Sequence, residues 1–177
     1  MPILAGILYS NEILFQGFID GLVYALIAMG LVLIYKATGV INFAQGAIGT
    51  FGGFVMGMLM VNYGLPYWLA AILAIAASAA VSTVTELLVV RRLFTKPRLL
   101  LFVATLGVAQ LVALIQIWLP TVDERVDYPT PIKGYWEIGG LDILLRGEQV
   151  TVLIVVPFLV IVPVSYTHLR AHETGYN

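Results

Sequence analysis

The sequence predicts an all-α integral membrane protein, a polytopic helical bundle with about five membrane-spanning helices and its N-terminus outside. Of its 177 residues, 60% are hydrophobic and only 11% are charged, whereas globular domains have roughly 45–50% apolar and 25% charged residues. The apolar residues also form long unbroken runs. Residues 21–35 carry no charge, and with residues 15–19 they reach the ~20 residues that a helix needs to cross a bilayer.

Later runs of the same kind predict the other spans. The second span follows Gly46, the third covers about residues 67–90, and the fourth covers about residues 99–119. A fifth begins near Val150, and its apolar run of ~15 residues is short for a crossing.

A basic loop predicts the orientation of these spans. Residues 91–98 hold four of the nine Lys and Arg residues, so we expect this loop to be cytoplasmic by the positive-inside rule. The third span then runs inward, which places the N-terminus and the polar stretch 121–148 outside and Lys36 inside. Because topology accounts for the basic loop and the net charge is −1, nucleic acid is not a predicted partner, whereas the lipid bilayer is.

Residues 36–46 interrupt the apolar pattern with polar side chains and glycines. Thr38, Asn42 and Gln45 stand beside Gly39 and Gly46 in this break. An amide that faced lipid without a partner would cost a few kcal/mol, so Asn42 and Gln45 should face protein or a water-filled cavity. Two interpretations stay open: these five residues line a substrate path, or the amides only bond neighbouring helices together.

Glycines at a spacing of four follow the break. Gly49, Gly53 and Gly57 form one stripe without side chains, which predicts a close crossing with another helix. The pattern indicates packing and says nothing about chemistry.

Glu86 is the one acid within the third span. An ionisable group in a membrane helix is a candidate functional residue with a partner to be named. Because Glu86 lies about one turn from the basic loop, we favour a boundary ion pair with Arg91 or Arg92 over a role in transport.

The stretch GLVYALIAMGLVLIYKATGVINFAQGAIGTFGGFV resembles the start of the permease subunits of bacterial branched-chain amino acid ABC importers. The likeness continues more weakly through ELLVVRRLFTKPRLLLFVATLGVAQL, and INFAQG is its most specific part. Two positions depart from the family pattern, because Gln45 stands where His is expected and Lys36 where Gly is expected. Glutamine does not titrate, so a proton-linked role at position 45 is not supported.

The resemblance implies a non-catalytic permease subunit in the bacterial inner membrane that moves branched-chain or similar amino acids by alternating access. It also implies partners: a second permease subunit, cytoplasmic ATPase subunits and an extracytoplasmic substrate-binding protein. The sequence has no G-x-x-x-x-G-K-[ST] loop for ATP. Two alternatives stay open, a urea or amide ABC permease and a stand-alone channel or secondary carrier.

The outer stretch 121–148 contains extended pieces and a Gly139-Gly140 turn that suggest a small hairpin. It is either a docking surface for the binding protein or a solvated connector.

Residues 1–164 are interpreted as the N-terminal part of the permease domain, and residues 165–177 as a non-native tail, because SYTHLRAHET resembles translated sequencing-adapter read-through. The tail holds both histidines, His168 and His172, but not in the order H-E-x-x-H. The chain has no cysteine. We therefore predict no metal site, no cofactor and no catalytic residue.

Overall fold

The computed structural model describes residues 11–120, 122, 130–140 and 143–173, with side chains for all of these except residue 37 and residues 162–173. The chain divides into two compact units. The first unit combines residues 1–30 with residues 130–177, and the second unit covers residues 31–129.

Helices account for most of the described residues, as expected. The elements are α2 (Asn11–Thr38), α3 (Ala44–Val61), α4 (Tyr67–Thr85), the π-helical turn η1 (Glu86–Val90), α5 (Arg91–Leu93), α6 (Arg98–Trp118), β1 (Tyr135–Ile138), β2 (Ile143–Arg146) and α7 (Gly147–Glu173).

Four helical segments in the described part of the chain are long and apolar enough to cross a membrane, which confirms a polytopic membrane protein. They are Asn11–Lys36, Ala44–Val61, Tyr67–Leu93 and Arg98–Trp118. The fifth expected span falls in α7, which contains a shorter apolar helical segment, Gly147–Ile161, among the residues whose side chains are described.

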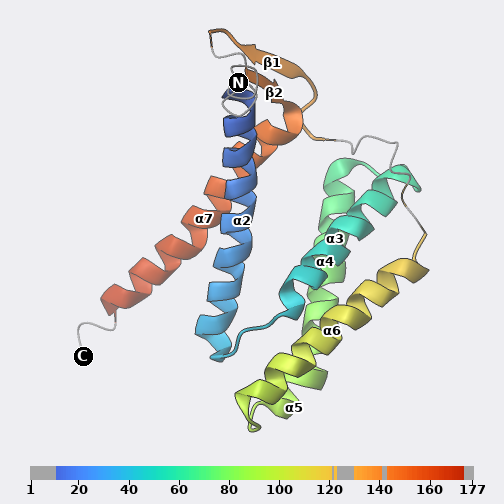
Figure 1. Cartoon of the computed structure of the whole chain (residues 1–177), viewed down its shortest axis with the longest axis vertical. Helices are drawn as coiled ribbons and strands as arrows, with labels where there is room; N and C mark the ends of the chain where they lie inside the picture. The colour runs from blue at the N-terminus through green and yellow to red at the C-terminus, as the bar shows by residue number, and fades with distance from the viewer. Residues whose placement is uncertain (1–10, 121, 123–129, 141–142, 174–177) are drawn as a thin grey trace, which may run out of the picture. The chain divides into compact units, whose positions relative to one another are not determined.

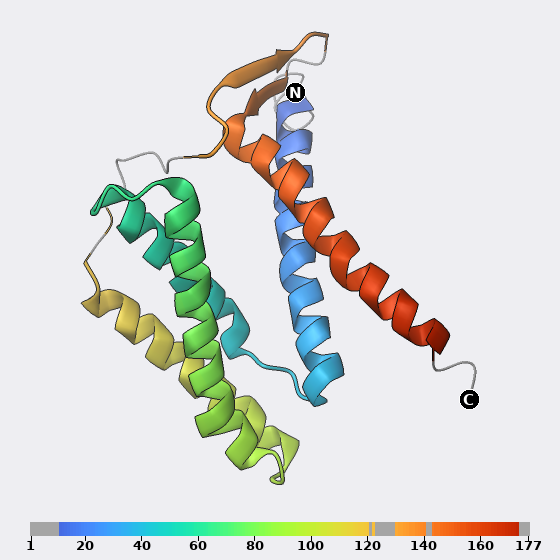
Figure 2. The ribbon, with the colours of Figure 1, turned by 180° about the vertical axis from the view of Figure 1, so that it is seen from behind.

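The first unit joins a β-hairpin to the starts of two helices. β1 and β2 pair in antiparallel register from Tyr135↔Arg146 to Ile138↔Ile143, which confirms the expected hairpin around the Gly139-Gly140 turn. The extended piece expected at residues 126–129 lies outside the described residues. In Figure 1 and Figure 2 the hairpin lies at the end of the unit where α2 and α7 begin.

The second unit is a helical bundle in which α3 packs against both α4 and α6. Figure 1 and Figure 2 both show these three helices side by side. Its core is a cluster of buried apolar side chains from α3 and α6, namely Ala44, Ile48 and Val112. Phe51, Val81 and Val108 are among the partly buried residues that pack around this cluster.

Glycine and proline residues set the helix boundaries in this unit. Gly39 has a φ of 69°, a left-handed conformation that suits glycine, and its N–H bonds the Tyr35 carbonyl at 2.7 Å to close α2. Pro66 and Pro97 immediately precede α4 and α6, where a missing N–H costs nothing. The helix is therefore interrupted between α2 and α3, and the residues of this interruption form part of the candidate site.

Candidate functional site

The break between α2 and α3 is shaped by its own polar side chains. The Thr38 hydroxyl donates to the Ile34 carbonyl at 2.8 Å and accepts a bond from the Val40 N–H at 3.3 Å. Asn42 Oδ1 accepts a bond from the Ala44 N–H at 3.0 Å, in the manner of an Asx turn. Asn42 thus satisfies an N–H that the start of α3 leaves unpaired, and Thr38 ties the backbone after α2 to the last turn of that helix.

A buried threonine of α6 connects the break to the bundle. Thr105 is 0% exposed, and its hydroxyl accepts a bond from the Phe43 N–H at 3.3 Å while donating to the Phe102 carbonyl at 2.9 Å. The rings of Phe43 and Phe102 meet edge to face with centroids 4.5 Å apart. One hydrogen bond and one aromatic pair therefore fix the position of the break against α6.

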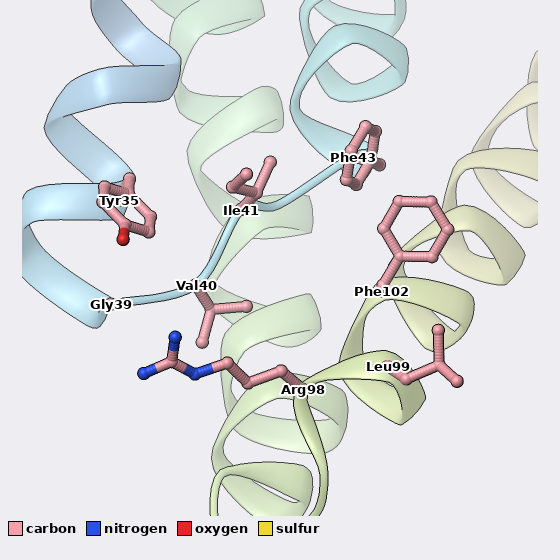
Figure 3. Close-up of a pocket in the computed structure, with 8 residues that line it drawn as sticks. All are labelled: Tyr35, Gly39, Val40, Ile41, Phe43, Arg98, Leu99 and Phe102. Atoms are coloured by element: carbon pink, nitrogen blue, oxygen red, sulfur yellow. The ribbon is translucent and has the colours of Figure 1, made fainter.

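A cavity of about 430 Å³ opens where the break faces the start of α6, and we call it the break pocket (Figure 3). Figure 3 shows the Arg98 side chain extending toward Gly39 and Val40, with the Phe43 and Phe102 rings on the other side of the pocket. Its lining residues are Tyr35, Gly39, Val40, Ile41, Phe43, Arg98, Leu99 and Phe102. The walls are thus apolar, with one guanidinium and one phenol among them.

A second cavity, of about 550 Å³, lies between α3 and α4, and we call it the α3–α4 groove. Small residues dominate its lining, which consists of Gln45, Ile48, Gly49, Gly52, Gly53, Met56, Ala71, Ala74, Ile75, Ser78, Ala79 and Ser82. Gln45 supplies the only amide among them. Its Oε1 is buried and has no hydrogen-bond partner within the part of the chain that the structure describes. A buried acceptor without a donor is costly, so this oxygen is suited to a ligand donor.

The glycines of α3 contribute to packing in a different register from the expected one. An added Cβ would meet nothing within 4 Å at Gly49 or Gly53, both of which line the groove, whereas at Gly52 it would meet the Ser78 side chain. Ser78 also donates a bond of 3.4 Å to the Ile48 carbonyl. Of the expected stripe, Gly57 alone is buried. The close approach of α3 and α4 therefore occurs at Gly52.

The five residues expected to line a path do not share one cavity. Gln45 lines the α3–α4 groove and Gly39 lines the break pocket. Thr38 and Asn42 are engaged with the backbone of the break, and Gly46 is exposed with open space around it. Of the two amides of the break, Gln45 lines one of these two cavities and Asn42 lines neither.

Sequence reasoning gave no site role to Thr105, Ser78 or Arg98. Thr105 lies in the segment where the family likeness continues more weakly, and its bond to Phe43 spans 62 residues. A polar residue in an apolar span was the available signal, but nothing in the sequence named its partner.

The expected ion pair of Glu86 with Arg91 or Arg92 is not formed. Within the described ranges, Arg146 and Glu148 make the single salt bridge, at 3.8 Å. The intervening residues form a π-helical turn rather than α-helix, so the spacing that the sequence suggested does not hold. All three side chains are exposed.

The first unit contains a chain of amide hydrogen bonds between the hairpin and the two helices. The Arg146 N–H donates to Gln149 Oε1 at 2.9 Å, Gln149 Nε2 donates to Gln16 Oε1 at 2.7 Å, and Gln16 Nε2 donates to Asp20 Oδ1 at 3.0 Å. Gln149 is only 7% exposed. These bonds hold the base of the hairpin to the starts of α2 and α7.

Comparison with known protein families identifies the chain. Residues 13–169 match the model of a family described as branched-chain amino acid transport system, permease component. The chain belongs to this family. The match spans all four crossing helices and the hairpin, and it ends five residues into the tail that was interpreted as non-native. No curated protein and no solved structure matches.

The permease therefore carries its candidate site in a membrane-spanning bundle rather than in a solvent-facing cleft. Among the residues that the structure describes, no group of three or more His, Cys, Asp or Glu side chains could hold a metal ion. The polar groups that could bind a ligand are the unsatisfied amide oxygen of Gln45 in the α3–α4 groove and the guanidinium of Arg98 in the break pocket.

Proposed function

We propose that this permease component is a subunit of a bacterial inner-membrane ABC importer that moves branched-chain or similar amino acids by alternating access. ATP hydrolysis is assigned to a separate cytoplasmic ATPase subunit, and a second permease chain completes the path. The family match and the INFAQG resemblance support this proposal.

The observation that carries the site is the buried Gln45 Oε1 in the α3–α4 groove. An amino acid has an α-ammonium group with three donors, which can satisfy an acceptor that has no protein partner. Ile48, Met56 and Ile75 offer apolar contacts in the same groove. A branched aliphatic side chain is favoured by such a lining, because apolar groups gain from leaving water.

The partner that delivers substrate is proposed to contact the hairpin. Tyr135 and Trp136 are 72% and 45% exposed, which leaves aromatic surface available for a protein contact. The amide chain through Gln149 holds this hairpin to α2 and α7, so a binding protein that docks there would meet a fixed surface.

The test is leucine uptake by cells that carry the complete transporter with Gln45→Leu. We expect uptake to fall at least tenfold, roughly the value of one hydrogen bond to a charged group, with the assembled amount unchanged. Gln110→Leu is the matched control, because this exposed amide of α6 lines neither cavity. Asn42→Leu is expected to lower the assembled amount instead, since Asn42 caps the start of α3.

Unchanged uptake in Gln45→Leu would remove Gln45 from the path. Uptake that persists after loss of the ATPase subunits would indicate a stand-alone channel or secondary carrier. Preference for urea or an amide over leucine would indicate the related urea or amide permease.

A further inference from the structure

The helical part of the second unit, residues 31–122, has an unbalanced charge distribution. Between residues 31 and 122 there is one carboxylate, Glu86, against five cations, which are Lys36, Arg91, Arg92, Lys96 and Arg98. Within the described ranges none of these cations forms a salt bridge, since the single pair joins Arg146 to Glu148. This part of the bundle therefore presents positive charge that no carboxylate of the described residues pairs with.

One of these cations, Arg98, borders the break pocket. Arg98 lies at the first position of α6, and its side chain extends toward Gly39 and Val40 along the break pocket (Figure 3). The pocket holds about 430 Å³, within the ~300–1,000 Å³ range of ligand pockets. No acidic side chain lines it.

The rest of the pocket is apolar, and part of its lining is exposed. Val40, Ile41, Leu99 and Phe102 line it, and Leu99 is 73% exposed. A ligand that fills this space needs an apolar part for these walls and an anionic group for Arg98. Inorganic phosphate would leave the walls uncovered, and a lipid without phosphate would leave the guanidinium unpaired. A zwitterionic phospholipid would bring a quaternary ammonium close to Arg98, and this cation would offset the attraction of its phosphate.

We propose that the break pocket binds one anionic phospholipid of the inner leaflet. The phosphate contacts the Arg98 guanidinium, whose planar set of donors matches phosphate oxygens. The Tyr35 hydroxyl lines the same pocket and is a second donor. An acyl chain lies against Val40, Leu99 and Phe102. The inner leaflet follows from the basic loop 91–98, which predicts a cytoplasmic position.

The experiment measures lipid retention by the purified 177-residue chain in uncharged detergent, using native mass spectrometry. The probes are phosphatidylglycerol and phosphatidylcholine with identical acyl chains. We expect phosphatidylglycerol to be retained about fivefold more strongly, the size of one interfacial cation, and Arg98→Gln to abolish the difference. Arg92→Gln is the matched control, because it removes the same charge from the same basic loop without lining the pocket. It should preserve the difference.

Equal losses in Arg98→Gln and Arg92→Gln would overturn the proposal, because they would show diffuse attraction to the loop. Displacement of the lipid by inorganic phosphate or glycerol 1-phosphate at equal concentration would overturn it too, since the apolar walls would then contribute nothing.

A second variant tests the apolar part of the site with Arg98 intact. Val40→Trp places a large side chain in the pocket and should lower phosphatidylglycerol retention to the phosphatidylcholine level. Retention at the original level would show that the acyl chain does not occupy this pocket. If Val40→Trp does not yield folded protein, the comparison of Arg98→Gln with Arg92→Gln decides the proposal.

Discussion

The two sides of α3 are packed by different means. On the α6 side, Ala44 and Val112 are buried in one apolar cluster, and Thr105 adds a buried hydrogen bond to the Phe43 N–H. On the α4 side, the helices approach at Gly52 and Ser78, and a cavity of about 550 Å³ remains beside the contact. The α6 side is packed by apolar side chains and a buried hydrogen bond, whereas the α4 side is packed at small residues with a cavity beside the contact.

The difference separates structural from functional surface on a single helix. Apolar burial gives little preference for helix over lipid, so helices in a membrane are held by close contact and by hydrogen bonds. The α6 side supplies both. The α4 side can therefore keep an open groove with an unsatisfied amide oxygen, because the position of α3 does not depend on filling it.

The largest effect should come from Gly52→Leu, which disrupts the close contact between Gly52 and Ser78 on the α4 side. The Leu side chain would have to occupy space held by Ser78. Overpacking of this kind costs about 1–3 kcal/mol and sometimes more, so we expect about 3 kcal/mol of lost stability. Unfolding by SDS titration in mixed micelles, followed by circular dichroism, measures it.

Gly46→Leu is the matched control, since an added side chain there meets open space. Two smaller substitutions test the same contact between Gly52 and Ser78. Gly52→Ala should destabilise the chain, and Ser78→Ala in the same protein should restore stability by removing the oxygen that the new Cβ meets. Equal stability of Gly52→Leu and Gly46→Leu would refute a close crossing at Gly52.

A smaller effect is expected from Thr105→Val on the α6 side. Valine keeps the shape but leaves the Phe43 N–H without its acceptor, which should cost about 1–2 kcal/mol. Thr105→Ser should retain most of the stability, because it keeps the hydroxyl. The control is Thr83→Val, whose exposed hydroxyl bonds only the Ala79 carbonyl of its own helix. Similar losses at positions 83 and 105 would contradict a special role for the buried bond.

The spans could be predicted from the sequence because about 20 apolar residues suffice to identify a crossing helix. The end of α2 could also be predicted, since glycine is a typical helix-terminating residue and Gly39 follows the first apolar run. The π-helical turn between α4 and α5 was not, because the sequence Glu86-Leu-Leu-Val-Val fits either helical period. Its consequence, the loss of the expected Glu86 ion pair, could not be foreseen.

Only part of the candidate site could be predicted from the sequence. Asn42 and Gln45 look equivalent as amides in a break, yet Asn42 precedes α3 and can reach the Ala44 N–H, whereas Gln45 lies within the first turn. The glycines show the same limit. Gly49 and Gly52 are three residues apart, so they lie only about 60° apart around α3 at 100° per residue. The partner helix determines which of these neighbouring positions makes the close contact.

The smallest effect is expected from Gln116→Leu, which removes the other polar contact on the α6 side. Gln116 Nε2 lies 3.5 Å from Thr50 Oγ1, at the limit of hydrogen-bond length, and the contact is exposed. The Thr50 hydroxyl keeps its bond to the Ala47 carbonyl at 2.9 Å without it. The expected change is therefore within about 0.5 kcal/mol, measured by the same SDS titration. Equal losses of stability in Gln116→Leu and Thr105→Val would contradict the role of burial. They would show that the number of polar contacts, and not their burial, stabilises the α6 side.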